Sequence, residues 1–239
     1  DQFGKAADID GNLFATSDGR QTVYLYDVSE QTLTQELPLA GADSSEYIRG
    51  LALGDGYLAV GIMGYGIDLP GRVFVYDVTS PSSPSLEYTL TYPGESAATG
   101  QSVSAWYGRG LEIDGGRLAI GAYYASLINA TGDESGRVWM HDLASGNLLF
   151  EVPPISTFGF GVDLALSGDR LLVLDHSGNT SSADVNYSGQ AWIFDASTGA
   201  VREQIRVPDL YGPTGFLCAE MDADHIVGCG YYDREHVQS

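Results

Sequence analysis

Basic residues are scarce in this sequence. Lys5 is the only lysine, and the 11 basic residues stand against 32 acidic ones, so the formal net charge is −21 and the isoelectric point is about 4.1. A field of that sign repels phosphate backbones and anionic lipid heads, so neither nucleic acid nor a membrane surface is an expected partner. The acids are scattered among turns and strand ends. We expect them to form a solubilising surface in a salt-rich or calcium-rich medium, or to include some cation ligands.

Long apolar runs and recognisable catalytic motifs are also missing. No run approaches the roughly 18 apolar residues that span a bilayer as a helix, so no direct membrane insertion is expected. No Gly-x-Ser-x-Gly, HExxH or phosphate-cradling loop occurs, and no signal peptide is visible. The two cysteines form no CxxC pair, and the four scattered histidines predict no zinc site with them.

Short strands are what the sequence contains instead. Between Tyr107 and Asp142, apolar runs at residues 107–113, 118–122 and 138–142 are separated by turns or loops that contain Asp and Gly. A fourth run at residues 148–152 ends before a proline, which suits a sheet edge because proline donates no hydrogen bond. These runs predict an antiparallel meander of four strands.

The same pattern recurs along the chain. Third strands that end in an acidic residue are expected at Asp27, Asp77, Asp142 and Asp195, which are 50, 65 and 53 residues apart. A period near 50 with four strands per unit is typical of β-propellers. The predicted fold class is therefore all-β, with four-stranded antiparallel blades. Aromatic residues at matching positions of the third strands are predicted to pack between blades; they are Tyr24, Tyr26, Phe74, Tyr76, Trp139, Trp192 and Phe194.

An aromatic-glycine pair opens three of the five units, at residues 3–4, 107–108 and 160–161, and the second strands of two units contain a glycine at Gly61 and Gly121. In these features the chain resembles the FG-GAP repeat family of integrin α-subunit heads and secreted bacterial proteins. The resemblance implies a seven-bladed ring and an extracellular or cell-surface location. The sequence would supply about four and a half blades of a single domain, and we expect a fragment of a longer chain. The blades are predicted at residues 3–46, 47–106, 107–159, 160–214 and, partially, 215–239.

The two cysteines lie in the last predicted hairpin. Centring its turn between Ala223 and Asp224 pairs Met221 with Ile226, and hence Cys218 with Cys229. Directly opposed Cβ atoms lie about 4.5–5.5 Å apart, slightly beyond the spacing of a relaxed disulfide. The pair is therefore either a somewhat strained cross-strand bridge or two small buried hydrophobic residues.

Calcium is the cofactor that the acidic composition raises. The turns between first and second strands are too short for a DxDxDG-type loop, and their Asp and Gly residues suit ordinary hairpins. The longer loops between second and third strands are the better candidates. Their possible cation ligands are Asp133, Glu134, Asp175 and Asp184, and the same loops contain three glycosylation sequons, at Asn129, Asn179 and Asn186.

Two acid–histidine neighbours raise the question of catalysis. His141-Asp142 belongs to the repeat, because Asp142 matches the other strand-end aspartates and His141 occupies an aromatic position. Those aspartates are expected to accept backbone hydrogen bonds at a turn. Asp175-His176 replaces a repeat glycine at the start of a long loop, where a carboxylate beside an imidazole suits acid–base chemistry.

Aromatic residues in or beside the loops are the predicted ligand contacts, because rings of this kind stack on sugars or pack against protein partners. They are Tyr65, Trp106, Tyr123, Tyr124, Tyr231 and Tyr232. The function expected is a non-catalytic extracellular module for interaction or adhesion that binds a protein or glycan through its loops, or a subunit of a larger surface assembly. The alternative is a polysaccharide-active lyase or hydrolase with a site near His176.

Overall fold

The structure is a computed structural model that describes residues 3–39, 41–42, 44–64, 71–93, 105–123, 136–152, 159–175, 190–206 and 214–232. All regular secondary structure in these ranges is β-strand, arranged as four sheets of four strands and one hairpin. Over the same ranges, no helix is long and apolar enough to cross a membrane. The predicted all-β class with four-stranded antiparallel units is confirmed.

Each unit is a meander in which sequential strands pair antiparallel. Blade 1 contains β1 (Ala7–Asp10), β2 (Leu13–Ser17), β3 (Thr22–Asp27) and β4 (Thr32–Pro38). Blade 2 contains β5 (Glu46–Gly54), β6 (Tyr57–Gly64), β7 (Arg72–Asp77) and β8 (Ser85–Thr91). Blade 3 contains β9 (Tyr107–Asp114), β10 (Arg117–Ala122), β11 (Arg137–Asp142) and β12 (Leu148–Val152). Blade 4 contains β13 (Phe160–Ser167), β14 (Arg170–Asp175), β15 (Gln190–Asp195) and β16 (Val201–Arg206), and the final hairpin contains β17 (Thr214–Met221) and β18 (Ile226–Tyr232).

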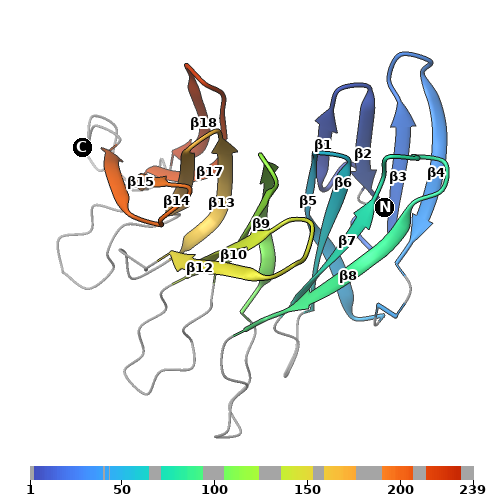
Figure 1. Ribbon diagram of the computed structural model, residues 1–239, viewed down its shortest axis with the longest axis horizontal. Coiled ribbons are helices and arrows are strands. Elements are labelled where there is room, and N and C mark those ends of the chain that lie inside the picture. Colours follow the sequence, from blue (N-terminus) through green and yellow to red (C-terminus); the bar gives the residue numbers. More distant parts are fainter. Residues whose placement is uncertain are drawn as a thin grey trace, which may run out of the picture.

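The units follow one another in chain order, as Figure 1 shows. The first strands of neighbouring units contact each other in the sequence β1, β5, β9, β13 and β17, so these strands form the inner edge of the assembly. This arrangement is that of propeller blades around an axis. The predicted ring size of seven blades stays a prediction.

Hydrophobic cores lie between successive blades. In the first core, Leu53, Leu58 and Phe74 of blade 2 pack against Ala15 and Leu25 of blade 1. Similar cores recur between blades 2 and 3 and between blades 3 and 4. The predicted packing of third-strand aromatics between blades is confirmed for those that are buried, which are Phe74, Tyr76, Trp139 and Phe194.

The aromatic-glycine pairs have a structural reason. Gly108 has a φ of +90°, which side chains other than glycine rarely adopt. That conformation places the Gly108 carbonyl against Gly61 of the preceding blade, where a Cβ atom on Gly61 would lie only 1.9 Å from the carbonyl oxygen. Gly161 and Gly121 repeat the contact one blade later, with 2.2 Å between the corresponding atoms. The two glycines of the repeat therefore allow close approach of neighbouring blades.

The strand-end aspartates close the turn after each third strand. The Oδ1 atom of Asp142 accepts hydrogen bonds from the backbone N–H of Ser145 at 2.9 Å and from its hydroxyl at 2.5 Å. Asp27, Asp77 and Asp195 accept the equivalent bonds from nearby serine or threonine residues and backbone N–H groups. These bonds lower the pKa of all four carboxyls, and the predicted role of the repeat aspartates is confirmed.

Candidate functional site

An aromatic pair lies at one end of blade 3. Trp106 immediately precedes β9 and Tyr123 immediately follows β10, so antiparallel pairing brings both residues to the same end of the sheet. Their rings stack with centroids 5.8 Å apart and planes inclined by 25°. Tyr123 is buried against blade 4, whereas Trp106 keeps part of its surface exposed. The structure therefore brings together two of the six predicted contact aromatics.

Trp106 has an unusual backbone conformation. Its φ is +55°, in the left-handed region that bulky residues rarely occupy. Residues held in such regions cluster at binding and catalytic sites, where the surrounding structure fixes them. The Trp106 carbonyl accepts a hydrogen bond from the N–H of Arg109 at 3.1 Å, which closes a turn into β9. The indole is thus held in a defined place at the rim of the blade.

Three further rings pack together in a separate core, between blades 2 and 3. Tyr92, just after β8, makes edge-to-face contacts with Tyr107 and Trp139, with centroids 6.1 and 5.7 Å away. Tyr107 and Trp139 contact each other at 5.5 Å in the same way. Such contacts add to the stabilisation from burial alone. His141, on the same strand as Trp139, is buried and its Nδ1 atom lies 3.1 Å from the Gly146 carbonyl oxygen, so this histidine is a packing residue of the repeat.

The side chains of the other four predicted contact aromatics lie outside the described part of the structure. Tyr65 and Tyr124 lie outside the described residues, and for Tyr231 and Tyr232 at the end of β18 only the backbone is described. The sequons at Asn129, Asn179 and Asn186 also lie outside the described ranges.

The predicted acid–base pair is only half described. Asp175 is the last residue of β14, its backbone pairs with Gln190, and its side chain is fully buried. A carboxylate in that position is enclosed by protein. His176 lies outside the described residues, as do the predicted cation ligands Asp133, Glu134 and Asp184. Within the described part of the chain, no three His, Cys, Asp or Glu side chains are placed to hold a metal ion.

Acidic residues of the hairpin turns join blades to one another. Asp55 lies in the turn between β5 and β6, and its Oδ2 atom accepts a hydrogen bond from the Gly116 N–H of the next blade at 2.7 Å. Asp114 accepts one from the Gly168 N–H at 2.8 Å in the same way. These bonds explain acidic residues in turns that are too short for a calcium loop.

Sequence analysis missed a pocket of mixed charge on the inner edge. The pocket has a volume of about 270 Å³ and is lined by residues of all five first strands. Its acidic lining residues are Asp8, Glu112, Asp163 and Glu220, and its basic ones are Lys5, Arg49 and Arg109. In the sequence, each of the four acidic residues stands between apolar neighbours on a first strand, which could have indicated a polar site. Only the arrangement of the blades shows that these residues meet.

Burial raises the pKa values of the four carboxyls in this pocket. Burial raises the pKa of Glu112 to about 9, and the nearby carboxylates of Asp8, Glu220 and Asp163 add to the rise. Burial also raises the pKa of Asp163 to about 6, against the opposing effects of the Ala219 N–H and Arg109. The pKa values of Asp8 and Glu220 are raised for the same main reason. Glu112 is therefore a neutral acid at pH 7 and can donate a hydrogen bond.

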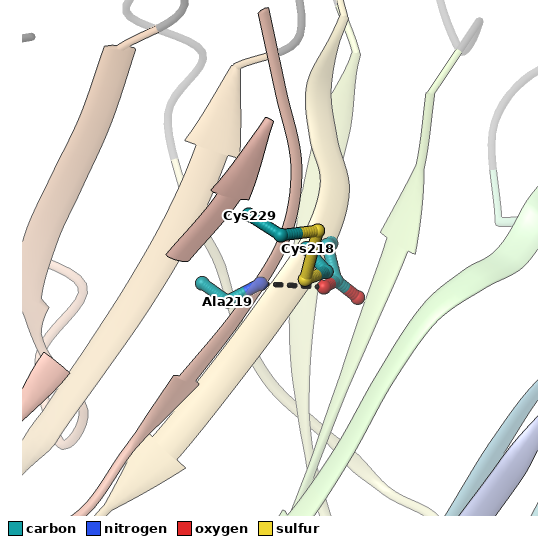
Figure 2. The surroundings of a disulfide bond; sticks show 4 residues. Cys218, Ala219 and Cys229 are labelled. Carbon is teal, nitrogen blue, oxygen red and sulfur yellow. Dashed lines mark hydrogen bonds between the residues drawn. A yellow bond between two sulfur atoms is a disulfide. The ribbon is translucent and has the colours of Figure 1, made fainter. Parts of the chain in front are cut away.

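The last hairpin contributes Cys218 and Glu220 to the lining of this pocket, and it contains a disulfide. Cys218 and Cys229 are bonded, with Cα atoms 5.1 Å apart, and the predicted register that pairs them and pairs Met221 with Ile226 is confirmed. Figure 2 shows the bond beside Ala219, whose N–H donates a hydrogen bond to the Oδ2 atom of Asp163 at 2.9 Å. The hairpin is thereby attached to blade 4 through the backbone as well as through its apolar side chains.

Comparison with known proteins extends only to the fold. No protein-family model matches the sequence, and no curated protein matches it. The structure is similar to the crystal structure of the computationally designed Ika8 protein, with 13% sequence identity and a TM-score of 0.55. The similar region covers 95% of this chain and 70% of the designed chain. At this identity the likeness concerns the fold alone.

Proposed function

We propose that this chain is an FG-GAP-like β-propeller module that acts outside the cell by binding a protein or glycan, without catalysis. The strand ends of blade 3 around Trp106 form the contact surface. Propellers serve many functions, so the proposal rests on the site and not on the fold.

The observation that carries the proposal is the conformation and placement of Trp106. A partly exposed indole, stacked on Tyr123 and held at a φ of +55°, presents a rigid apolar surface at the blade rim. Tryptophan loses little side-chain entropy on binding and is enriched among residues that dominate interfaces. Sugar rings and apolar side chains are the partners that such a surface accommodates.

One further observation supports the extracellular setting, and another bears on the kind of partner. The disulfide between Cys218 and Cys229 is of a kind that persists in oxidising compartments. The net charge of −21 opposes binding to nucleic acid and anionic membranes, which leaves neutral or basic partners.

The proposal is tested by screening the protein against a glycan array and against extracellular proteins of its source, followed by titration of the strongest hit. Trp106→Ala should weaken binding at least tenfold, because hot-spot tryptophans contribute about 2 kcal/mol or more. Trp192→Phe, on another blade, is the matched control and should bind like the wild type. Equal binding by the wild type and Trp106→Ala would refute the assignment of this surface.

The same preparations distinguish binding from catalysis. We expect no turnover of acidic or neutral polysaccharides. Turnover that disappears in a folded His176→Ala variant would contradict the non-catalytic proposal and favour the polysaccharide-active alternative.

A further inference from the structure

Aromatic side chains fill the outer part of two of the clefts between blades. Tyr88 of β8 lies in the cleft between blades 2 and 3, where its hydroxyl donates a hydrogen bond to the carbonyl oxygen of Leu143. Its ring lies over Gly146, since a Cβ atom there would be 2.9 Å from the ring. One blade later, the ring of Phe150 lies over Gly199 at the same distance. Each ring thus closes the cleft over a glycine.

The first cleft, which lies between blades 1 and 2, lacks an equivalent ring from its fourth strand. Tyr88 and Phe150 pair with Val75 and Met140 of the third strands, just before the ladder is interrupted by a bulge. The equivalent residue in blade 1 is Gln35, which pairs with Leu25 at the same place. The Gln35 amide donates a hydrogen bond to the backbone carbonyl of its neighbour Glu36 at 2.7 Å, so it turns back onto its own strand.

The glycine is also replaced in the first cleft. Gly146 and Gly199 each come four residues after the strand-end aspartate of their blade, and the residue four positions after Asp77 is Pro81. The residue one position after each aspartate is Leu143 in blade 3 and Val78 in blade 2. Val78 and Pro81 are therefore the counterparts of the two groups that contact Tyr88.

An open pocket of about 390 Å³ occupies this cleft, and both Val78 and Pro81 line it. Its volume is in the range of small-molecule sites. Leu13 and Leu53 contribute further apolar lining. The polar lining residues include Asp10, Asn12, Asp27, Thr34 and Ser82. The pocket lies at the turn end of blades 1 and 2, and Trp106 lies at the opposite end of the strands.

We propose that this pocket binds a phenolic ring in the position that Tyr88 occupies in the next cleft, with the phenol hydroxyl donating to the Val78 carbonyl. The repeat itself supplies the argument, because the fourth strands of blades 2 and 3 place an aromatic ring in the next two clefts, whereas blade 1 has Gln35 at the equivalent position. Tyr57 also lines the pocket, but its side chain packs against the core between blades 2 and 3. Asp10 and Asp27 in the lining, within a chain of net charge −21, favour a ligand whose remaining part is neutral or positively charged. This inference is independent of the function proposed for the Trp106 surface.

The test uses tyramine as the probe, with binding followed by NMR chemical shifts of the full 239-residue chain. Tyramine should bind saturably with a dissociation constant near 1 mM, as expected for a ligand of about ten heavy atoms. 4-Hydroxyphenylacetate has the same ring with a negative charge, and cyclohexylamine has the positive charge without an aromatic ring. Both should bind at least fivefold more weakly. No saturation by tyramine up to 20 mM, or equal binding of all three, would overturn the proposal.

Two substitutions locate the site. Gln35→Tyr should place a ring in the cleft and abolish tyramine binding. Glu36→Tyr is the matched control, because adjacent strand residues point to opposite faces and this ring should leave binding unchanged. Tyr88→Gln should open the second cleft and add a second tyramine site. Undiminished binding by a folded Gln35→Tyr variant would overturn the assignment. A peptide with one tyrosine between two lysines identifies the source: tighter binding than tyramine indicates a partner polypeptide, and weaker binding indicates a free phenolic amine.

Discussion

Replacing Glu112 by glutamine should make the free energy of unfolding less dependent on pH. The pKa of this carboxyl is raised from an ordinary value of 4.5 to about 9, mainly by burial in the pocket on the inner edge. Between those two values the folded protein keeps a proton that the unfolded chain releases. The stability that this proton provides is complete below pH 4.5 and is lost as pH rises toward 9.

The magnitude follows from the proton difference. One proton corresponds to about 1.4 kcal/mol per pH unit, so the free energy of unfolding should fall by about 2.7 kcal/mol between pH 6 and pH 8 from this residue. Glutamine cannot ionise and fills nearly the same volume. Glu112→Gln should therefore have a free energy of unfolding close to that of the wild type near pH 4.5, and a higher one at pH 8.

Urea unfolding followed by tryptophan fluorescence at pH 6 and pH 8 measures both quantities. The difference between the two pH values should shrink by about 2.7 kcal/mol in Glu112→Gln. Glu36→Gln removes an equal charge from an exposed position on β4 and should keep the wild-type difference. A wild-type pH dependence in folded Glu112→Gln would refute the reasoning about this pocket.

Three further outcomes test the contacts between and within blades. Gly121→Ala should lower the free energy of unfolding by about 1–3 kcal/mol in urea titrations, because its Cβ atom would clash with the carbonyl of Gly161 on the next blade. Cys218→Ser should lower the free energy of unfolding by roughly 3 kcal/mol at most, because the disulfide closes a loop of 11 residues in the unfolded chain. In limited proteolysis of this variant, the first cleavage should lie in the last hairpin. Glu46→Ala should lower the free energy of unfolding by about 2–4 kcal/mol, because it removes the partner of Arg72. The Nη2 atom of the Arg72 guanidinium lies 2.6 Å from the buried Glu46 carboxylate. An unchanged melting temperature would contradict this interpretation.

Local chemistry made much of the fold predictable from the sequence. A hairpin register is fixed by its turn, so the pairing of Cys218 with Cys229 followed from the sequence alone. The strand-end aspartates were predictable for the same reason, because their hydrogen bonds are made within three residues of themselves. The repeat of these local features predicted the all-β class and the four-stranded units.

The site was less predictable. The sequence suggested Trp106 and Tyr123 as contact residues because they lie beside loops. They are 17 residues apart, however, and their stacking depends on the pairing of β9 with β10. Asp175 was placed beside a loop by the repeat alignment, whereas its side chain is fully buried. Alternation along a strand predicts a face, but it does not say how deeply a neighbouring blade covers that face.

The sequence by itself therefore determined the repeating unit. Alternation of apolar and polar residues predicts the strands, Asp and Gly predict the turns, and the aromatic-glycine pairs mark where neighbouring blades approach closely. Only the tertiary structure decided what the blades form together. Asp8, Glu112 and Asp163 belong to three different blades and Glu220 to the final hairpin, and they meet because the first strands share the inner edge. The pocket of about 390 Å³ lies between blades 1 and 2, where Gln35 is the counterpart of Tyr88 and Phe150. A missing ring is visible only when the surrounding blades are in place.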